Sequence, residues 1–286
     1  MIPTISRTTI AFTAATLLMF APVSSPAIAA PRVTSTIDVG NDPYSVAFSP
    51  NGKTAYVVNF ADDSVSVINV STGTVQGSPI AVGDEPTSVA FSPNGKTAYV
   101  ANTADDSVSV INVTTSTVQG SPIAVGDNPA AVAFTHNGKT AYVANYNDDT
   151  VSVINVKTST VHGAPIAVGN GPASVAFTPN GKEAYVINGD DDTVSVINVK
   201  TSAVHGAPIA VGAYPMAAAF TPNGKKAYVA CGNDDTVSVI NVKTSTVQGA
   251  PIGVGNGPYS VALSPNGKIA YVANAEGGTV SVITTK

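Results

Sequence analysis

The 286-residue chain has no tryptophan, one cysteine and three histidines, and only 11% of its residues are charged. A single cysteine, Cys231, excludes an intramolecular disulfide. His136, His162 and His205 form no motif of a zinc site or a catalytic triad. The net charge of −5 provides no basic footprint, so general nucleic-acid binding is not expected. Beyond the first 30 residues the only arginine is Arg32, which argues against an arginine-clamped anion site.

The N-terminus has the composition of a secretory signal peptide. An apolar stretch covers residues 10–23 and is followed by the small residues Ala27 and Ala29. Cleavage after Ala29 is predicted, which makes residues 1–29 the signal peptide and residues 30–286 a single domain. The stretch is too short and too interrupted by proline for a membrane span. The predicted location is therefore secreted, periplasmic or at the cell surface.

The rest of the chain consists of repeats marked by one tripeptide. The tripeptide Asn-Gly-Lys recurs with a constant spacing of 43 residues, beginning at Asn51, Asn94, Asn137, Asn180, Asn223 and Asn266. A fixed period in this range is typical of propellers, solenoids and other repeat arrays. The repeat therefore predicts the architecture before any chemistry is considered.

Each repeat reads as four antiparallel strands. In the first, residues 44–49, 54–59 and 64–70 are predicted strands separated by turn residues, and the first and third of them alternate between apolar and polar side chains. Residues 74–83 form a weaker fourth strand, which contains a proline and is therefore placed at the outer edge. This pattern predicts an all-β, six-bladed propeller of four-stranded blades.

The ends of the chain predict how the ring closes. The last repeat stops after its third strand, whereas residues 33–40 align with the fourth strands of the other repeats. The N-terminal strand is therefore predicted to complete the C-terminal blade, which would remove exposed sheet edges.

The second strands share a motif that identifies a family resemblance. It reads Tyr-Val-x-Asn in five repeats and ends in Cys231 in another, and a Pro-Asn-Gly-Lys turn precedes most copies. The sequence resembles the YVTN-type β-propeller repeat family over nearly the whole mature chain. The resemblance implies a propeller fold and a surface-layer-like or exported protein, with propeller lactonases as relatives. Many relatives have seven blades, but the repeat count here predicts six.

The two ends of the predicted propeller carry opposite charge. Lysines occupy the turns after the first and third strands, whereas paired aspartates such as Asp105 and Asp106 occupy the loops after the second strand. The pairs could bind Ca²⁺, but they lack the spacing of a known calcium loop, and aspartate is itself a favoured turn residue. No metal or other cofactor is predicted.

A ligand site on a ring of near-identical repeats is expected where the repeats differ. The departures gather mainly in later repeats and on the acidic face, although drift after duplication would also produce them. The predicted ligand-binding residues are Tyr44, Ile187, Asp190, Tyr214, Met216, Cys231, Tyr259 and Glu276. Together they would line a small aromatic and sulfur-containing hollow suited to a peptide or small apolar ligand. Cys231 is interpreted as a buried, inert thiol.

The resulting functional prediction is a monomeric, non-catalytic binding scaffold at or outside the cell envelope. Its partner would be a protein, a peptide or an envelope polymer, and no catalytic residue is assigned. The alternative is a lactonase-like hydrolase whose unrecognised site lies on the acidic loop face. A third possibility is a purely structural surface-layer module.

Overall fold

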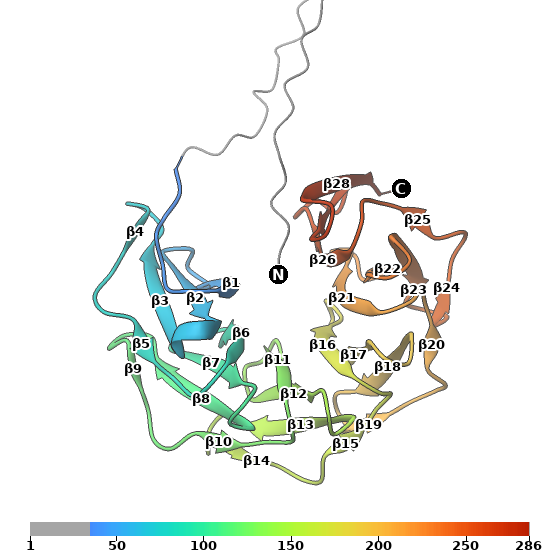
Figure 1. Ribbon diagram of the computed structural model, residues 1–286. Coiled ribbons are helices and arrows are strands. Elements are labelled where there is room, and N and C mark those ends of the chain that lie inside the picture. Colours follow the sequence, from blue (N-terminus) through green and yellow to red (C-terminus); the bar gives the residue numbers. More distant parts are fainter. Residues whose placement is uncertain (1–34, 286) are drawn as a thin grey trace, which may run out of the picture. The chain divides into compact units, whose positions relative to one another are not determined.

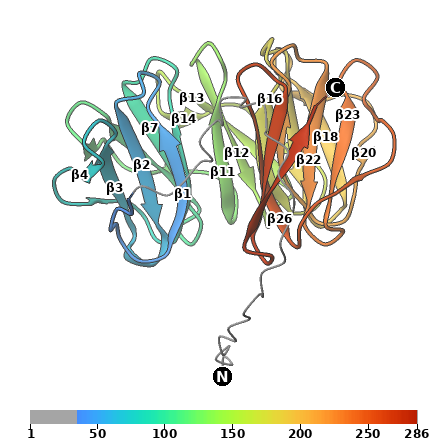
Figure 2. The ribbon, with the colours of Figure 1, turned by 90° about the horizontal axis from the view of Figure 1, so that it is seen from above.

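The computed structural model describes residues 35–285, and nearly all of its regular structure is strand. The predicted signal peptide and its cleavage site lie outside the described residues. One compact unit spans Ile37–Lys286, and its sheets surround a central axis (Figures 1 and 2). Among the described residues no helix is long and apolar enough to cross a membrane.

The first blade shows how one repeat folds. Its inner strand β1 (Pro43–Phe48) pairs with β2 (Thr54–Asn59), which pairs with β3 (Ser64–Asn69). The outer strand is split into β4 (Thr74–Val75) and β5 (Ile80–Ala81), which pair with opposite ends of β3. A single-turn 3-10 helix, η1 (Phe60–Asp62), connects β2 to β3.

The next four blades repeat this strand order, and among the described residues the sixth contains its first three strands only. Their strands are β6 (Pro86–Phe91), β7 (Thr97–Asn102), β8 (Ser107–Asn112), β9 (Thr117–Val118) and β10 (Ile123–Ala124); β11 (Pro129–Phe134), β12 (Thr140–Asn145), β13 (Thr150–Asn155), β14 (Thr160–Val161) and β15 (Ile166–Ala167); β16 (Pro172–Phe177), β17 (Glu183–Asn188), β18 (Thr193–Asn198), β19 (Ala203–Val204) and β20 (Ile209–Ala210); β21 (Pro215–Phe220), β22 (Lys226–Cys231), β23 (Thr236–Asn241), β24 (Thr246–Val247) and β25 (Ile252–Gly253); and β26 (Pro258–Leu263), β27 (Ile269–Asn274) and β28 (Thr279–Thr284). The predicted six-bladed, all-β propeller is confirmed.

The hydrophobic core lies between blades, because each sheet is buried on both faces. Tyr56 of the first blade packs against Phe91 of the second, with ring centroids 4.6 Å apart. Val58 and Val65 from the first blade and Val100 from the second belong to the same buried cluster. Equivalent clusters join each later pair of successive blades up to the fifth and sixth. Each blade is therefore stabilised mainly by its neighbours.

The interface between the sixth and first blades differs from the other five. None of the buried clusters of residues 35–285 joins these two blades. Val282 is 60% exposed, whereas Val153 at the same position of the third blade is 3% exposed. Phe48 on the facing side of the first blade is 63% exposed. Figure 1 shows the corresponding gap between β1 and β26. We call this open interface the seam.

The predicted closing strand is not formed within the described residues. The sixth sheet contains only β26, β27 and β28, and residues 35–39 belong to no strand. Ile37 and Val39 instead lie against the first blade, near Val46 and Val57. The alignment of residues 33–40 with the fourth strands of the other repeats predicted that they pair with β28. The alignment alone could not determine whether the backbone hydrogen bonds of that pairing form. Residues 33 and 34 of the predicted strand lie outside the described residues.

Alkaline pH is expected to destabilise the propeller through its buried tyrosines. Burial raises the pKa of Tyr56, Tyr99 and Tyr142, and burial with the nearby Glu183 charge raises that of Tyr185 to about 12. An unfolded tyrosine titrates near pH ~10. The folded state therefore holds protons that the unfolded chain loses, and the stabilisation, complete below pH ~10, should be lost as pH rises towards the folded pKa values.

Urea unfolding between pH 8 and pH 12, followed together with tyrosinate absorbance, would measure this effect. The free energy of unfolding should fall above pH ~10, and most ionisation should accompany unfolding. Reversible ionisation of all ten tyrosines near pH ~10 with the β-sheet signal intact would contradict the prediction.

Candidate functional site

The inner strands all begin with the same irregularity. In the first blade Pro43 pairs with Asn59 and Ser45 with Val58, so Tyr44 is an extra, bulged residue. Every other blade has the same shift after its first proline. A β-bulge redirects a side chain away from the regular alternation of the strand. The six bulged residues are Tyr44, Thr87, Ala130, Ala173, Met216 and Tyr259.

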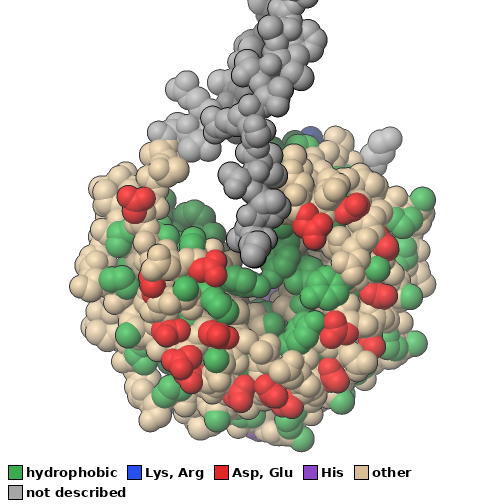
Figure 3. Space-filling view, viewed as in Figure 1, with side chains coloured by type: hydrophobic (Ala, Val, Ile, Leu, Met, Phe, Trp, Pro, Cys, Tyr) green, Lys and Arg blue, Asp and Glu red, His purple; other side chains and the backbone are tan. Residues whose placement is uncertain are grey.

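These six residues meet at one end of the axis. All of them line a pocket of about 490 Å³, which we call the axial mouth. Figure 3 shows this end of the molecule, with apolar side chains at the centre and acidic side chains around them. The bulges therefore place one variable residue from every blade around a common space. This is the arrangement a ligand site requires in a repeat protein.

A second set of residues precedes the inner-strand prolines. All six have a positive φ, and they are Asp42, Glu85, Asn128, Gly171, Tyr214 and Gly257. Glu85, Asn128 and Tyr214 line the axial mouth. Tyr214 has a φ of 51°, a left-handed conformation that costs a non-glycine residue about 1–3 kcal/mol and is typical of functional sites.

A third set follows the second strand of each blade, and here the mouth becomes asymmetric. Phe60, Thr103 and Tyr146 line it in the first three blades. The equivalent residues of the last three blades are Gly189, Gly232 and Ala275. Aromatic and hydroxyl side chains therefore project from this position on one side only, and on the other side Tyr214 approaches the two glycines instead.

Two hydrogen bonds fix tyrosine hydroxyls at the mouth. The hydroxyls of Tyr44 and Tyr259 lie 2.5 Å apart across the seam, and either can donate. Tyr146 donates to Oδ1 of Asp190 at 2.9 Å. Burial, and then the neighbouring Tyr214 hydroxyl and Asp190 carboxylate, raise the pKa of Tyr146. Burial and the Tyr44 hydroxyl likewise raise the pKa of Tyr259. Both phenols therefore stay protonated at neutral pH and act as donors.

Carboxylates reach the mouth in two ways. Glu85 lines it directly. The side chains of Asp190 and Glu276 pack directly against glycines of the neighbouring loops. A Cβ on Gly171 would lie 2.6 Å from Oδ2 of Asp190, and a Cβ on Gly257 would lie 2.6 Å from Cγ of Glu276. Glycine at these two positions therefore makes room for the carboxylate of the adjacent loop. Within residues 35–285 no group of three or more histidine, cysteine, aspartate or glutamate side chains could hold a metal ion.

The structure brings most of the predicted ligand-binding residues together. Tyr44, Tyr214, Met216 and Tyr259 line the axial mouth. Glu276 lines an adjoining hollow of about 200 Å³ that shares three of these residues. Asp190 contacts the mouth through Tyr146.

Ile187 and Cys231 lie elsewhere and correct the predicted set. Both are fully buried in the core between the fourth and fifth blades. They occupy the ends of second strands, where the side chain faces the neighbouring blade rather than the axis. Burial raises the pKa of the Cys231 thiol, consistent with an inert structural cysteine.

The predicted ligand-binding set omitted several residues of the mouth, among them Glu85, Asn128 and Tyr146. These residues also differ from the equivalent residues of the other repeats, which is the signal that identified the predicted ligand-binding residues. Glu85 stands where other repeats have aspartate, asparagine, glycine or tyrosine, and Tyr146 stands where they have phenylalanine, threonine, glycine or alanine.

The paired aspartates have a structural task. Oδ1 of Asp149 accepts a hydrogen bond of 2.9 Å from the backbone N–H of Gly171 in the next blade. Asp63 and Asp192 make the same inter-blade contact with the backbone N–H groups of Glu85 and Tyr214. Turn preference alone is therefore an incomplete explanation, because these carboxylates also hold the loops of the mouth in position.

Replacing Asp149 with alanine is expected to lower the free energy of unfolding by about 1–2 kcal/mol, because the Gly171 N–H loses its acceptor. Thermal or urea unfolding would measure the loss. Asp84→Ala is the matched control, since no hydrogen bond to the Asp84 carboxylate is seen within residues 35–285. Equal effects of the two substitutions would contradict this role for Asp149.

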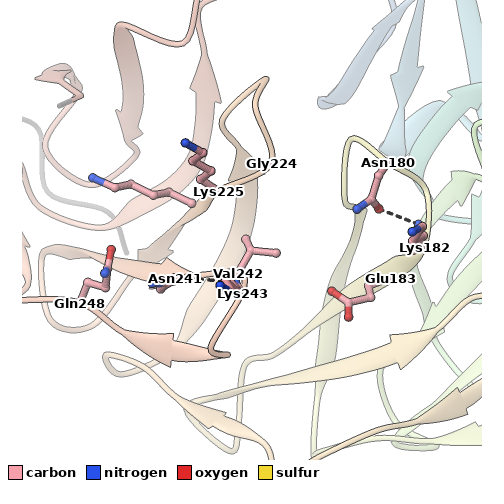
Figure 4. Close-up of a pocket in the computed structure, with 10 residues that line it drawn as sticks. Asn180, Lys182, Glu183, Gly224, Lys225, Asn241, Val242, Lys243 and Gln248 are labelled. Atoms are coloured by element: carbon pink, nitrogen blue, oxygen red, sulfur yellow. Dashed lines mark hydrogen bonds between the residues drawn. The ribbon is translucent and has the colours of Figure 1, made fainter.

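A second pocket, of about 610 Å³, lies at the basic end between the fourth and fifth blades. Figure 4 shows Lys225 and Lys243 on one side of it, and Lys182 and Glu183 on the other. These residues come from turns that recur in nearly every repeat. The axial mouth is the stronger candidate, because it gathers the residues in which the repeats differ.

Comparison with known families gives a match along the chain. A family model described as lactonase, seven-bladed β-propeller matches residues 25–162, 75–252 and 157–285. The overlap of these ranges is expected for repeats that align in more than one register. The predicted relation to a β-propeller family is confirmed, and the matched family is the lactonase family. No curated protein matches the sequence.

Solved structures show the fold at low sequence identity. Hydrazine synthase of Kuenenia stuttgartiensis is 24% identical with a TM-score of 0.59, over 89% of this chain and 99% of that chain. A functionally unknown protein of Desulfotomaculum acetoxidans DSM 771 is 15% identical with a TM-score of 0.75, over 86% and 83%. A putative 6-phosphogluconolactonase of Bacteroides uniformis ATCC 8492 is 18% identical with a TM-score of 0.74, over 84% and 80%.

These findings correct the functional prediction. The expected non-catalytic scaffold is contradicted by the lactonase family match, which favours the alternative, a hydrolase-like propeller. The prediction rested on the absence of histidine and arginine from the acidic face. That absence excludes a histidine-based site there, but it does not exclude one built from carboxylates and tyrosines.

Proposed function

Because the chain belongs to the lactonase family of seven-bladed β-propellers, we propose that it is a hydrolase that opens a lactone ring at the axial mouth. The observation that carries the proposal is the gathering of carboxylates and protonated tyrosine hydroxyls where the repeats differ. The described residues form six blades. The proposed site therefore belongs to a six-bladed member of a family described as seven-bladed.

Lactone hydrolysis requires a general base, a hydrogen-bond donor and a source of a proton for the leaving group. A base takes a proton from water while the water oxygen bonds to the carbonyl carbon. A hydrogen-bond donor stabilises the negative charge that develops on the carbonyl oxygen. The ring C–O bond then breaks, the alkoxide leaving group receives a proton, and the product is a hydroxy acid.

Glu85 is the proposed general base, because this acidic residue lines the mouth and its backbone N–H donates a hydrogen bond to Oδ1 of Asp63 that holds the backbone in place. The proton that Glu85 takes from water can return to the ring oxygen when the C–O bond breaks. Glu85 is thereby restored, and atoms and charges balance.

The Tyr44–Tyr259 pair is the proposed donor to the carbonyl oxygen. One hydroxyl of the pair donates to the other, which leaves the second proton free for the substrate. Tyr146 is committed to Asp190, so it serves as a wall of the site rather than as the primary donor. Thr87 and Thr103 of the second blade, whose hydroxyls lie 2.9 Å apart, add polar groups to the wall of the mouth.

The test is hydrolysis of unsubstituted and alkyl-substituted γ- and δ-lactones by the purified protein, followed by proton release at constant pH. Turnover should exceed the spontaneous rate and should elute with the protein. Linear esters and phosphodiesters serve as comparison substrates, and each assay is run with EDTA and with added divalent metals. Absence of turnover across all lactones under all conditions would overturn the proposal.

A further inference from the structure

The charge around the axial mouth has one sign. Within residues 35–285 every lysine lies in a turn at the opposite end of the propeller or at the start of a strand there, and arginine does not occur. Glu85 lines the mouth, Glu276 lines the adjoining hollow, and Asp190 accepts a hydrogen bond from Tyr146 of the mouth. Figure 3 shows the acidic side chains that surround the opening. Among the described residues, a ligand entering this end of the axis therefore meets negative potential and no lysine or arginine side chain.

The wall of the mouth is aromatic. Tyr44, Phe60, Tyr146, Tyr214 and Tyr259 line it, and the rings of Tyr44 and Phe60 have centroids 5.8 Å apart. The faces of such rings attract cations through their quadrupole, and aromatic cages are a common site for quaternary ammonium groups. The raised pKa values of Tyr146 and Tyr259 keep these rings neutral.

We propose that the axial mouth selects a ligand that carries an ammonium group, and that the substrate is a lactone with a cationic amino or quaternary ammonium substituent. This inference rests on the proposed lactonase function for the reaction, but the recognition of the cation stands on the aromatic wall and the carboxylates. The ammonium group would contact the ring faces, and the carboxylates at the opening would complement its charge. An anionic lactone would be repelled by the same carboxylates.

Binding can be separated from hydrolysis with lactams, which share the shape of lactones but resist opening. Three γ-butyrolactams are compared by calorimetry: one with a trimethylammonium group at the α carbon, one with the isosteric tert-butyl group, and one with a carboxylate. The cationic lactam should bind at least about fivefold more tightly than the tert-butyl lactam, the gain expected of a cation–π contact. The carboxylate lactam should bind most weakly.

The matched variant is Phe60→Leu, which removes an aromatic face and no hydroxyl. It should reduce the ratio of cationic to tert-butyl affinity, and it should change tert-butyl affinity little. Raising the salt concentration should reduce the same ratio, because salt screens the carboxylates. Equal or tighter binding of the tert-butyl lactam, tightest binding of the carboxylate lactam, or an unchanged ratio in Phe60→Leu would each overturn the inference.

The corresponding lactones distinguish this inference from the function on which it rests. Their enzymatic rates are divided by their spontaneous rates, because a cationic substituent also activates the ring. Preference for the cationic lactam without turnover of any lactone would overturn the hydrolase proposal and support the cation site. Turnover of neutral and anionic lactones at least as fast as the cationic one, without preference among the lactams, would overturn the cation site alone.

Discussion

Glu85→Gln is expected to lower kcat for lactone opening by about 10²–10⁴-fold, the usual contribution of a positioned general base. Glutamine preserves the size of the side chain and the backbone hydrogen bond to Asp63, so the mouth keeps its shape. It cannot take a proton from water. KM should change much less than kcat, because the substitution removes a proton acceptor and leaves the aromatic wall intact. Steady-state kinetics on a lactone turned over by the wild-type protein would measure both values.

Asp84→Asn is the matched control for this substitution. It removes the same charge from the neighbouring residue of the same loop, but Asp84 does not line the axial mouth. Its kcat should stay within about threefold of the wild type, since only long-range electrostatics change. Comparable losses in both variants, or full activity in Glu85→Gln, would contradict the assignment. Unchanged melting temperatures would show that the comparison concerns chemistry rather than folding.

Val153→Asp is expected to destabilise the propeller by about 3–5 kcal/mol, whereas Val282→Asp should change the free energy of unfolding by less than about 0.5 kcal/mol. The two valines occupy the same position of the third and sixth blades. Val153 is 3% exposed and Val282 is 60% exposed. A carboxylate at position 153 loses its hydration between two blades, whereas one at position 282 faces the open seam and stays hydrated.

Urea unfolding of both variants would measure the difference. Val153→Ala and Val282→Ala provide a milder pair if Val153→Asp fails to fold, and the same order is expected because only the buried valine leaves a cavity. Equal losses at the two positions would contradict the open seam. They would indicate that the sixth interface packs in solution like the other five.

Local sequence patterns were sufficient for the framework of the fold. The alternation of Ser64–Asn69 and the Asn-Gly turns act over a few residues, and six nearly identical copies left little freedom in strand order. The opposite charge of the two ends followed from antiparallel order alone. The same reasoning placed Tyr44, Tyr214, Met216 and Tyr259 on one face, because all four lie in loops or strand starts at the acidic end.

Orientation of individual side chains required the tertiary structure. A simple strand pattern does not reveal the bulge at Tyr44, which turns the side chain towards the axis. The strand pattern also does not distinguish Ile187 from Asp190, which lies three residues further along the chain. Ile187 packs against the neighbouring blade, whereas Asp190 accepts a hydrogen bond from Tyr146. Glu85 and Tyr146 are 61 residues apart in the sequence and line one mouth, because the ring brings successive blades to a common axis.

The sequence by itself determined the repeat, the number of blades and the charge of each face, since these depend on short-range periodicity. Only the tertiary structure decided which variable residues share the axial mouth, which aspartates tie blades together, and that the sixth interface stays unpacked among the described residues. These features depend on contacts between residues of different blades. The free energy of these contacts depends on distances between blades and on burial between them, which the sequence of a single repeat does not specify.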